Sequence, residues 1–154
     1  SRRIGWRVSM RLAERTDYAL RVLMLLTARQ ERLTVAEMAR WLNVSAHHLT
    51  KVVQALQDEG WVWTSRGRGG GVELAADPST LVVGDVVRAI EPDMDLVECF
   101  RTSGGCRIED SCGLAAVLHS AREAFLSELD RATLSTLVHG HRADLLELTV
   151  DLGR

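Results

Sequence analysis

Three cysteines lie within fourteen residues, at Cys99, Cys106 and Cys112, and the rest of the 154-residue chain has none. Their spacing is C-x6-C-x5-C, with glycine and polar residues in the intervals. An odd number of cysteines does not make a closed set of disulfides. Thiolate sulfur instead favours zinc, copper(I) or an iron–sulfur cluster. Because three sulfurs leave one coordination position open, the segment predicts a metal site that needs one further ligand.

Length and composition bound what can position such a site. The chain is 46% hydrophobic, which is enough for one compact domain or for a small domain with an appended element. We find neither an apolar run long enough to cross a membrane nor a secretory leader, so we expect a cytoplasmic protein with reduced thiols. Met10 is a natural start, and residues 1–9 are expected to be an upstream extension or an expression remnant.

Charge is divided unevenly along the chain. Residues 1–76 carry 12 basic and 7 acidic side chains, a net charge of +5. Residues 77–154 carry 7 basic and 14 acidic side chains, a net charge of −7. A basic first half favours contact with a polyanion such as DNA through that half alone. Charge by itself decides little, because solvated faces often carry a few like charges.

Two helices are expected early in the chain. Apolar residues at helical spacing predict a buried helix from about residue 16 to 29, with Thr16 as its N-cap. A second, short helix is expected over residues 35–42, because Thr34 and Glu37 have the spacing of a capping box.

A third helix should run from Ser45, its cap, to about Glu59, where Gly60 ends it. Two short helices joined by a tight turn indicate a helix-turn-helix, whose second helix enters the major groove. Its candidate DNA contacts are Ser45, His47, His48, Thr50 and Lys51. The alternative is an ordinary helical hairpin with solvated polar residues, and the helices alone do not decide between the two.

The following segment favours DNA binding. Residues 61–64 and 72–74 are predicted strands joined by a glycine-rich loop, which is the hairpin wing of a winged helix. The tip can enter a minor groove with Arg66, Gly67 and Arg68. The loop lacks the Gly-Lys-Ser/Thr ending of a phosphate-binding loop and joins strand to strand, so we reject that function. We expect Trp61 and Trp63 to pack the wing rather than stack on bases.

A short helix over residues 81–90 leads to the cysteine loop, and a long helix should then run from about 114 to 136. Its apolar stripe comprises Leu114, Leu118, Ala121, Phe125, Leu129 and Ala132. We expect this helix to pair with its twin; the alternative is that it folds back on its own domain. The tail either packs or lacks fixed structure. The predicted organisation is a winged helix-turn-helix domain (10–80), a connecting helix with the cluster-binding loop (81–112), a dimerisation helix (113–138) and a C-terminal tail (139–154).

Several separated motifs resemble those of one protein family. They are residues 10–21 (MRLAERTDYALR), 34–39 (TVAEMA), 49–53 (LTKVV) and 66–71 (RGRGGG). In this order they resemble the bacterial winged-helix iron–sulfur transcriptional regulators, the family of NsrR, IscR and RirA, over residues 10–138. Segments 96–100 and 124–130 are most similar to NsrR, the nitric-oxide-sensing repressor. The resemblance implies a mainly α homodimer that binds palindromic promoter DNA and holds a 4Fe–4S or 2Fe–2S cluster on the three cysteines.

The resemblance also suggests the missing ligand. IscR-like members use a histidine three residues after the last cysteine, where this chain has Ala115. NsrR-like members can use an aspartate of the other subunit, and Asp17 occupies the matching position. The alternative is that Asp17 only stabilises the dipole of its helix. His119 is expected to be a surface or interface residue. Residues 113–115 are neutral where members often have a basic residue, so the surroundings of the cluster can differ.

The implied mechanism is release of promoter DNA when nitric oxide nitrosylates the cluster. Cysteine spacing leaves open an iron or redox sensor of the same fold, similar to RirA or IscR, and also a structural zinc site. An enzyme with a nucleophilic cysteine would need a positioned base, and no such pair is indicated, so we expect no catalytic residues.

Overall fold

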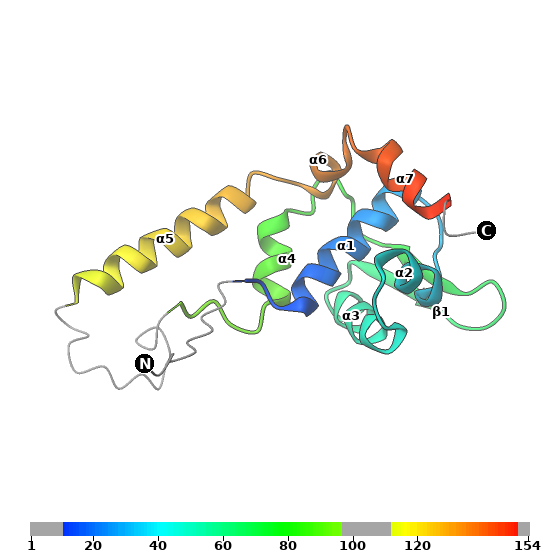
Figure 1. Ribbon diagram of the computed structural model, residues 1–154, viewed down its shortest axis with the longest axis horizontal. Helices are drawn as coiled ribbons and strands as arrows, with labels where there is room; N and C mark the ends of the chain where they lie inside the picture. Colours follow the sequence, from blue (N-terminus) through cyan, green and yellow to red (C-terminus); the bar gives the residue numbers. More distant parts are fainter. Residues whose placement is uncertain (1–10, 97–111, 151–154) are drawn as a thin grey trace, which may run out of the picture.

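The computed structural model describes residues 11–96 and 112–150, so Cys99 and Cys106 lie outside the described residues. Within those ranges the chain is mainly helical with one small sheet (Figure 1). In chain order the elements are α1 (Glu14–Arg29), α2 (Val35–Leu42), α3 (Ala46–Asp58), β1 (Val62–Ser65), β2 (Gly71–Leu74), α4 (Val83–Ile90), α5 (Gly113–Leu129), α6 (Leu134–Val138) and α7 (Arg142–Val150). None of the helices in these ranges has the length and hydrophobicity needed to cross a bilayer.

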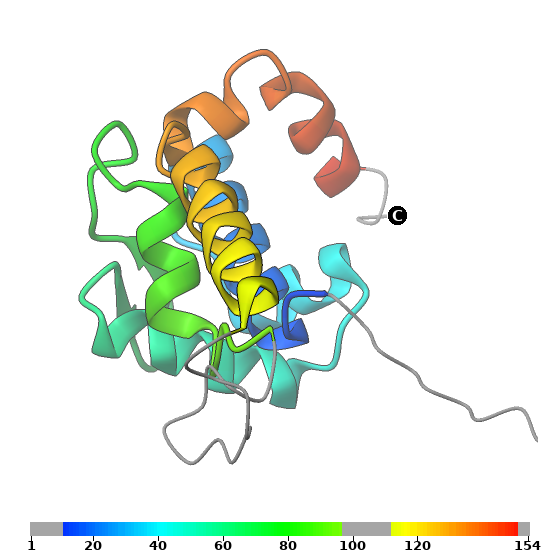
Figure 2. The ribbon, with the colours of Figure 1, turned by 90° about the vertical axis from the view of Figure 1, so that its left-hand side faces the viewer.

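The first helix forms the centre of the fold, with α3, α4 and α6 packed around it (Figures 1 and 2). Its side chains Ala19, Val22, Leu23 and Leu26 are at most 1% exposed. Burying a valine or leucine stabilises a fold by roughly 1.5–3 kcal/mol. The predicted N-cap was wrong, because α1 begins at Glu14 and Thr16 is buried inside the helix.

The predicted helix-turn-helix forms with the expected caps. The backbone N–H of Thr34 donates to the Glu37 carboxylate at 2.8 Å, and Glu37 N donates to Thr34 Oγ1 at 3.2 Å. The hydrogen bonds from Thr34 hold the pKa of Glu37 below its ordinary value of 4.5. Asn43 makes the turn with a left-handed φ of 54°, and Ser45 Oγ accepts from His48 N at 3.0 Å to start α3.

The wing is a hairpin with a third extended segment beside it. β1 and β2 pair antiparallel, with Ser65 opposite Gly71 at the tip end. Leu33, just before α2, exchanges backbone hydrogen bonds with Val72 at 3.0 and 2.7 Å. A Cβ at Gly71 would lie 2.8 Å from the carbonyl oxygen of Leu33, so only glycine permits this close approach.

The two tryptophans of the wing differ. Trp61 is partly buried against the hydrophobic core, at the base of the wing. Trp63 is 67% exposed, so the expectation that it packs the wing was wrong. Alternate side chains point to opposite faces of a strand, and the outer face of this hairpin is solvated.

The long helix after the cysteines ends earlier than expected. It stops at Leu129, and the prediction of one helix to about residue 136 was wrong. The Asp130 carboxylate instead turns to α4 and accepts two hydrogen bonds from Arg88, at 2.6 and 2.7 Å. This pairing lowers the pKa of Asp130 and raises that of Arg88. Thr133 then starts α6 through a capping box with Thr136.

The C-terminal segment packs on the fold as far as it is described. It forms α7, which lies at the end of α1. Arg29 donates to the hydroxyl of Thr149 at 2.8 Å, and Arg142 Nε donates to the carbonyl of Ala28 at 2.9 Å. Of the two alternatives for the tail, packing is therefore correct for residues 142–150.

We predict that Gly84→Ala destabilises the protein. A Cβ at Gly84 would overlap the Oδ1 atom of Asp130 and crowd the Arg88 guanidinium. Both atoms lie at the ends of partly exposed side chains, so the added Cβ should displace the Asp130 carboxylate from Arg88. We expect a small decrease in the midpoint of urea denaturation relative to Gly113→Ala, because an exposed ion pair contributes little to stability. Gly113→Ala is the control, because nothing lies within 4 Å of its added Cβ. If both variants unfold at the same urea concentration, the α4–α5 junction does not depend on this close contact.

Candidate functional site

One face of α3 presents a row of exposed polar side chains. Their spacing of three and four residues places them on the same side of the helix: His47, Thr50, Lys51 and Gln54. The opposite side carries the buried residues Leu49, Val52, Val53 and Leu56. Sequence reasoning missed Gln54, although its position seven residues after His47 was a usable signal. Groups of these types can donate to and accept from base edges in a major groove.

Three of the predicted DNA contacts also have partners within the fold. The Ser45 hydroxyl caps α3, and the Thr50 hydroxyl donates to the carbonyl of Ala46 at 2.8 Å. The ring of His48 lies edge-on to Tyr18 of α1, with centroids 5.7 Å apart and an angle of 86° between planes. The His48 ring therefore contacts α1, and His48 lies about 100° around α3 from His47.

The tip of the wing is exposed and basic. Arg66, Gly67 and Arg68 all lie at the surface, and among the described residues neither arginine has an acidic partner. Arg32, which precedes α2, contacts the wing loop: its guanidinium donates to the carbonyl of Gly69 at 2.9 Å. The guanidinium groups at the tip are thus available to a phosphate backbone or a narrow minor groove.

Asp17 lies in the first turn of α1, as predicted, with its side chain 44% exposed. Arg21, one turn later, holds both carboxylate oxygens at 3.0 and 2.8 Å. The side chain lines a surface pocket of about 520 Å³. Its wall on α1 includes Asp17, Tyr18 and Arg21, and its other wall is the helix-turn-helix turn, Leu42, Asn43 and Val44.

Of the three cysteines, the structure describes only Cys112. It is a half-buried free thiol at the N-cap position of α5. Within residues 11–96 and 112–150, no group of three or more His, Cys, Asp or Glu side chains gathers closely enough to bind a metal ion. Cys99 and Cys106, the other two proposed ligands, lie outside the described residues.

A distant carboxylate caps α1. The helix has no side-chain cap of its own, and the backbone N–H of Ala13 donates to both carboxylate oxygens of Glu91, at 3.2 and 3.1 Å. Glu91 follows the last residue of α4, at the start of the segment that leads to the cysteines. Sequence reasoning missed it, because no local pattern relates two residues 78 positions apart.

The fifth helix leaves an apolar face uncovered. Leu114, Val117 and Phe125 are 62%, 64% and 44% exposed, and Leu126 is the buried residue of this helix. His119 is exposed on the same helix, as expected. In Figure 1, α5 extends away from the body of the fold, which it contacts through α4. The helix therefore does not fold back over its own domain, which was the alternative to pairing.

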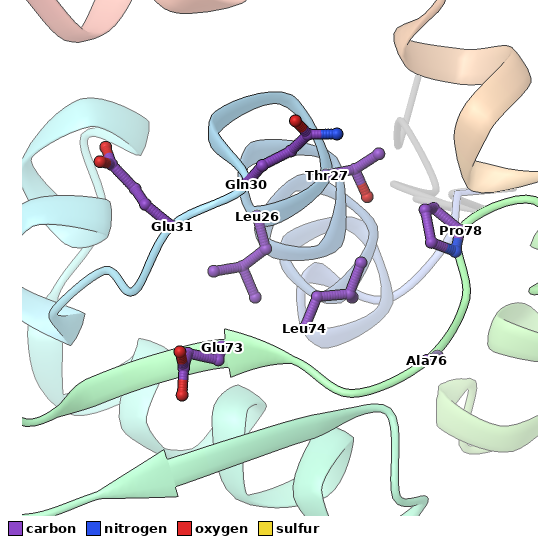
Figure 3. A pocket seen from close by; sticks show the side chains of 8 residues that line it. All are labelled: Leu26, Thr27, Gln30, Glu31, Glu73, Leu74, Ala76 and Pro78. Carbon is purple, nitrogen blue, oxygen red and sulfur yellow. The ribbon is translucent and has the colours of Figure 1, made fainter.

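A separate pocket of about 310 Å³ lies behind the wing. It is lined by Leu26, Thr27, Gln30, Glu31, Glu73, Leu74, Ala76 and Pro78, and Figure 3 shows its two leucines lying toward one another. Glu31 is paired with Arg29 at 2.6 Å, and Glu73 with Arg32 at 2.8 Å. Its charged side chains are thus already neutralised within the fold, and we assign the pocket no ligand.

Comparison with known proteins identifies the family of this chain. The family model described as Rrf2, iron-dependent transcriptional regulator, matches residues 12–140. The chain belongs to the Rrf2 family. This Rrf2 regulator is 43% identical to the HTH-type transcriptional regulator NsrR of Geobacillus kaustophilus, over 90% of the chain and 96% of that relative. It is 42% identical to NsrR of Bacillus subtilis, over 90% of the chain and 97% of that relative.

Solved structures confirm the predicted fold class. A transcriptional regulator from Listeria innocua is 28% identical, with a TM-score of 0.69 over 84% of this chain and 88% of that one. IscR of T. potens has the same fold, with 20% identity and a TM-score of 0.67 over 84% of this chain and 87% of that one. The resemblance noted in the sequence is confirmed, and the Rrf2 regulator is a transcriptional regulator rather than an enzyme.

Removal of the Glu91 carboxylate should loosen the start of α1. We expect Glu91→Ala to lower the free energy of unfolding by about 0.5–2 kcal/mol, the usual effect of losing an N-cap, in thermal or urea unfolding. Glu91→Gln should lose less, because its amide oxygen still accepts from Ala13. Glu59→Ala is the control, since the Glu59 side chain is exposed. A Glu91→Ala variant as stable as this control would show that the cap contributes nothing.

Proposed function

We propose that this Rrf2 regulator is a homodimeric repressor in the cytoplasm that binds double-stranded promoter DNA and carries an iron–sulfur cluster sensitive to nitric oxide. The proposed ligands are Cys99, Cys106 and Cys112 of one subunit and Asp17 of the partner subunit. Three thiolates suit a 4Fe–4S or a 2Fe–2S cluster. The identity to NsrR proteins supports the resemblance from which the cluster and the nitric oxide signal are inferred.

The position of Asp17 is the observation that carries the sensing proposal. Its carboxylate is exposed in a pocket between α1 and the turn of the helix-turn-helix. The start of α5, next to Cys112, lies well apart from the start of α1 of the same chain in Figure 1. This separation supports an Asp17 ligand from a second copy. The cysteine segment of one subunit would then be tied to the DNA-binding domain of the other.

The Asp17 carboxylate is suited to be the cluster ligand that is released. When bound, the cluster would supply an iron atom that nitric oxide can bind, and a hard carboxylate oxygen is a poor match for that soft centre. On release from the iron, the Asp17 carboxylate would pair with Arg21, as it does in this structure. Each α1 would then be free of the other subunit's cysteine segment, and the spacing of the two α3 helices would no longer be held.

DNA binding would use the exposed face of α3 and the wing. The face with His47, Lys51 and Gln54 would enter the major groove, and Arg66 and Arg68 would contact the backbone or the minor groove. The net charge of +5 on residues 1–76 supports this orientation, because the acidic second half would face away from DNA.

An iron-responsive regulator of the same fold is the second candidate. The description of the family model as iron-dependent favours it. The two candidates differ in what releases the promoter DNA. A nitric-oxide sensor releases DNA on exposure to nitric oxide even when iron is plentiful. An iron sensor releases DNA when a chelator removes the iron.

Protein purified without oxygen should be coloured and should contain both iron and sulfide. We expect Asp17→Ala to change the absorbance spectrum or to lower the iron content per chain. Glu14→Ala, which removes the other acidic residue of the same helical turn, should leave both unchanged. A colourless wild-type protein with one zinc per chain would contradict the cluster, and an unchanged Asp17→Ala spectrum would contradict the fourth ligand alone.

Loss of a wing arginine should weaken DNA binding at every sequence. For Arg68→Ala we expect the slope of log affinity against log salt to fall by about 1, because one phosphate contact is lost. The measurement is fluorescence anisotropy with a promoter fragment at several salt concentrations. Arg131→Ala, an exposed arginine after α5, is the control and should keep the wild-type slope. An unchanged slope for Arg68→Ala would place the wing away from the DNA.

The uncovered face of α5 should hold the dimer together. Val117→Glu would bury an unpaired charge there, so we expect the dimer dissociation constant to rise at least about 100-fold in sedimentation equilibrium. Ala116 lies about 100° around the helix from Val117, so Ala116→Glu should leave the dimer intact. A Val117→Glu protein that is still dimeric at the same concentrations would show that the subunits meet elsewhere.

A further inference from the structure

One contact joins α1 to the DNA-reading helix beside the Asp17 pocket. The rings of Tyr18 and His48 meet edge to face, with centroids 5.7 Å apart and planes at 86°. This is a favoured geometry for aromatic pairs. The backbone of His48 is fixed at the start of α3 by its bond to Ser45. A shift of the Tyr18 ring would therefore displace the His48 ring at the first turn of α3.

Tyr18 is also coupled to the proposed ligand. It follows Asp17 in sequence, and both side chains line the pocket whose far wall is the turn before α3. The helix that carries them is anchored by Ala19 and Val22, which are fully buried. The first turn holds the fully buried Thr16 beside the partly exposed Asp17, and its backbone is capped by the distant carboxylate of Glu91. A change in what holds Asp17 can thus reach Tyr18, the next residue of the helix, while Ala19 and Val22 stay in place.

His48 was first interpreted as a base-reading residue. Its side chain lies about 100° around the helix from His47, as consecutive residues do, and its ring lies against Tyr18. In the proposed function, the exposed face that begins with His47 contacts the bases. The ring of His48 is exposed and contacts Tyr18, and its role as a base contact stays a prediction.

We propose that Tyr18 is a positioning residue, which passes the state of the Asp17 carboxylate to the recognition helix α3 through its ring contact with His48. The proposal rests on the proposed function, because it requires Asp17 to change its partner when the signal arrives. Tyr18 itself touches neither DNA nor metal in this account.

The direct test compares promoter affinity with and without the cluster. Each variant is prepared metal-free and after anaerobic reconstitution with ferrous iron and sulfide, and the ratio of the two dissociation constants is measured. We expect Tyr18→Leu to reduce this ratio by about 2- to 10-fold, the range of an aromatic pair. Tyr18→Phe keeps the ring and should keep the wild-type ratio. His47→Ala should weaken both forms equally, which also leaves the ratio unchanged. A wild-type ratio in Tyr18→Leu would overturn the proposal.

A second readout does not depend on the cluster. In the metal-free protein, Asp17→Asn weakens the pairing with Arg21, and NMR can follow the ring resonances of His48. We expect these resonances to move when Tyr18 is present and to stay in place in a Tyr18→Leu background. His48 resonances that ignore Asp17→Asn in both backgrounds would overturn the proposal. If instead the wild-type affinity is the same with and without the cluster, the proposed function fails, and the NMR result still decides the role of Tyr18.

Discussion

The burial of α1 at the centre of the fold constrains everything around it. Its middle and end are locked by side chains that are almost fully buried, such as Leu23 and Leu26. Its first turn holds the buried Thr16 and the partly exposed Asp17, and the backbone N–H of Ala13 before it donates to the Glu91 carboxylate from the end of α4. The start of the helix therefore contacts the residue from which the chain continues to the cysteine segment. A helix held in this way can pass a local change at Asp17 to the elements that pack on it.

The same arrangement separates the proposed DNA-binding face from the proposed sensing site. The exposed face of α3 and the wing arginines point away from the core, where DNA can reach them. Asp17 and Tyr18 lie on the other side of the helix-turn-helix turn, within the same pocket. The apolar face of α5 lies on a third element, away from both. A dimer formed through α5 would therefore leave the reading face free.

Local signals made much of this fold predictable. The helix-turn-helix follows from caps that act within three or four residues, such as Thr34 with Glu37 and Ser45 with His48. Contacts between distant residues were not predictable. The end of α5 depends on Arg88 and Asp130, which are 42 positions apart, and no local pattern relates them. For the same reason Thr16 was wrongly expected to cap α1.

The candidate site was predictable only in part. The types of the exposed residues on α3 could be read from the sequence, but the ring contact between His48 and Tyr18 is a tertiary feature. The central claim is that the state of the iron–sulfur site governs promoter binding. The most direct measurement is a gel-shift on one anaerobic preparation before and after nitric oxide, with a promoter fragment that the untreated protein selects from genomic DNA. We predict an affinity loss of roughly 5- to 150-fold, the usual range of allosteric coupling. Equal binding before and after exposure would contradict the account.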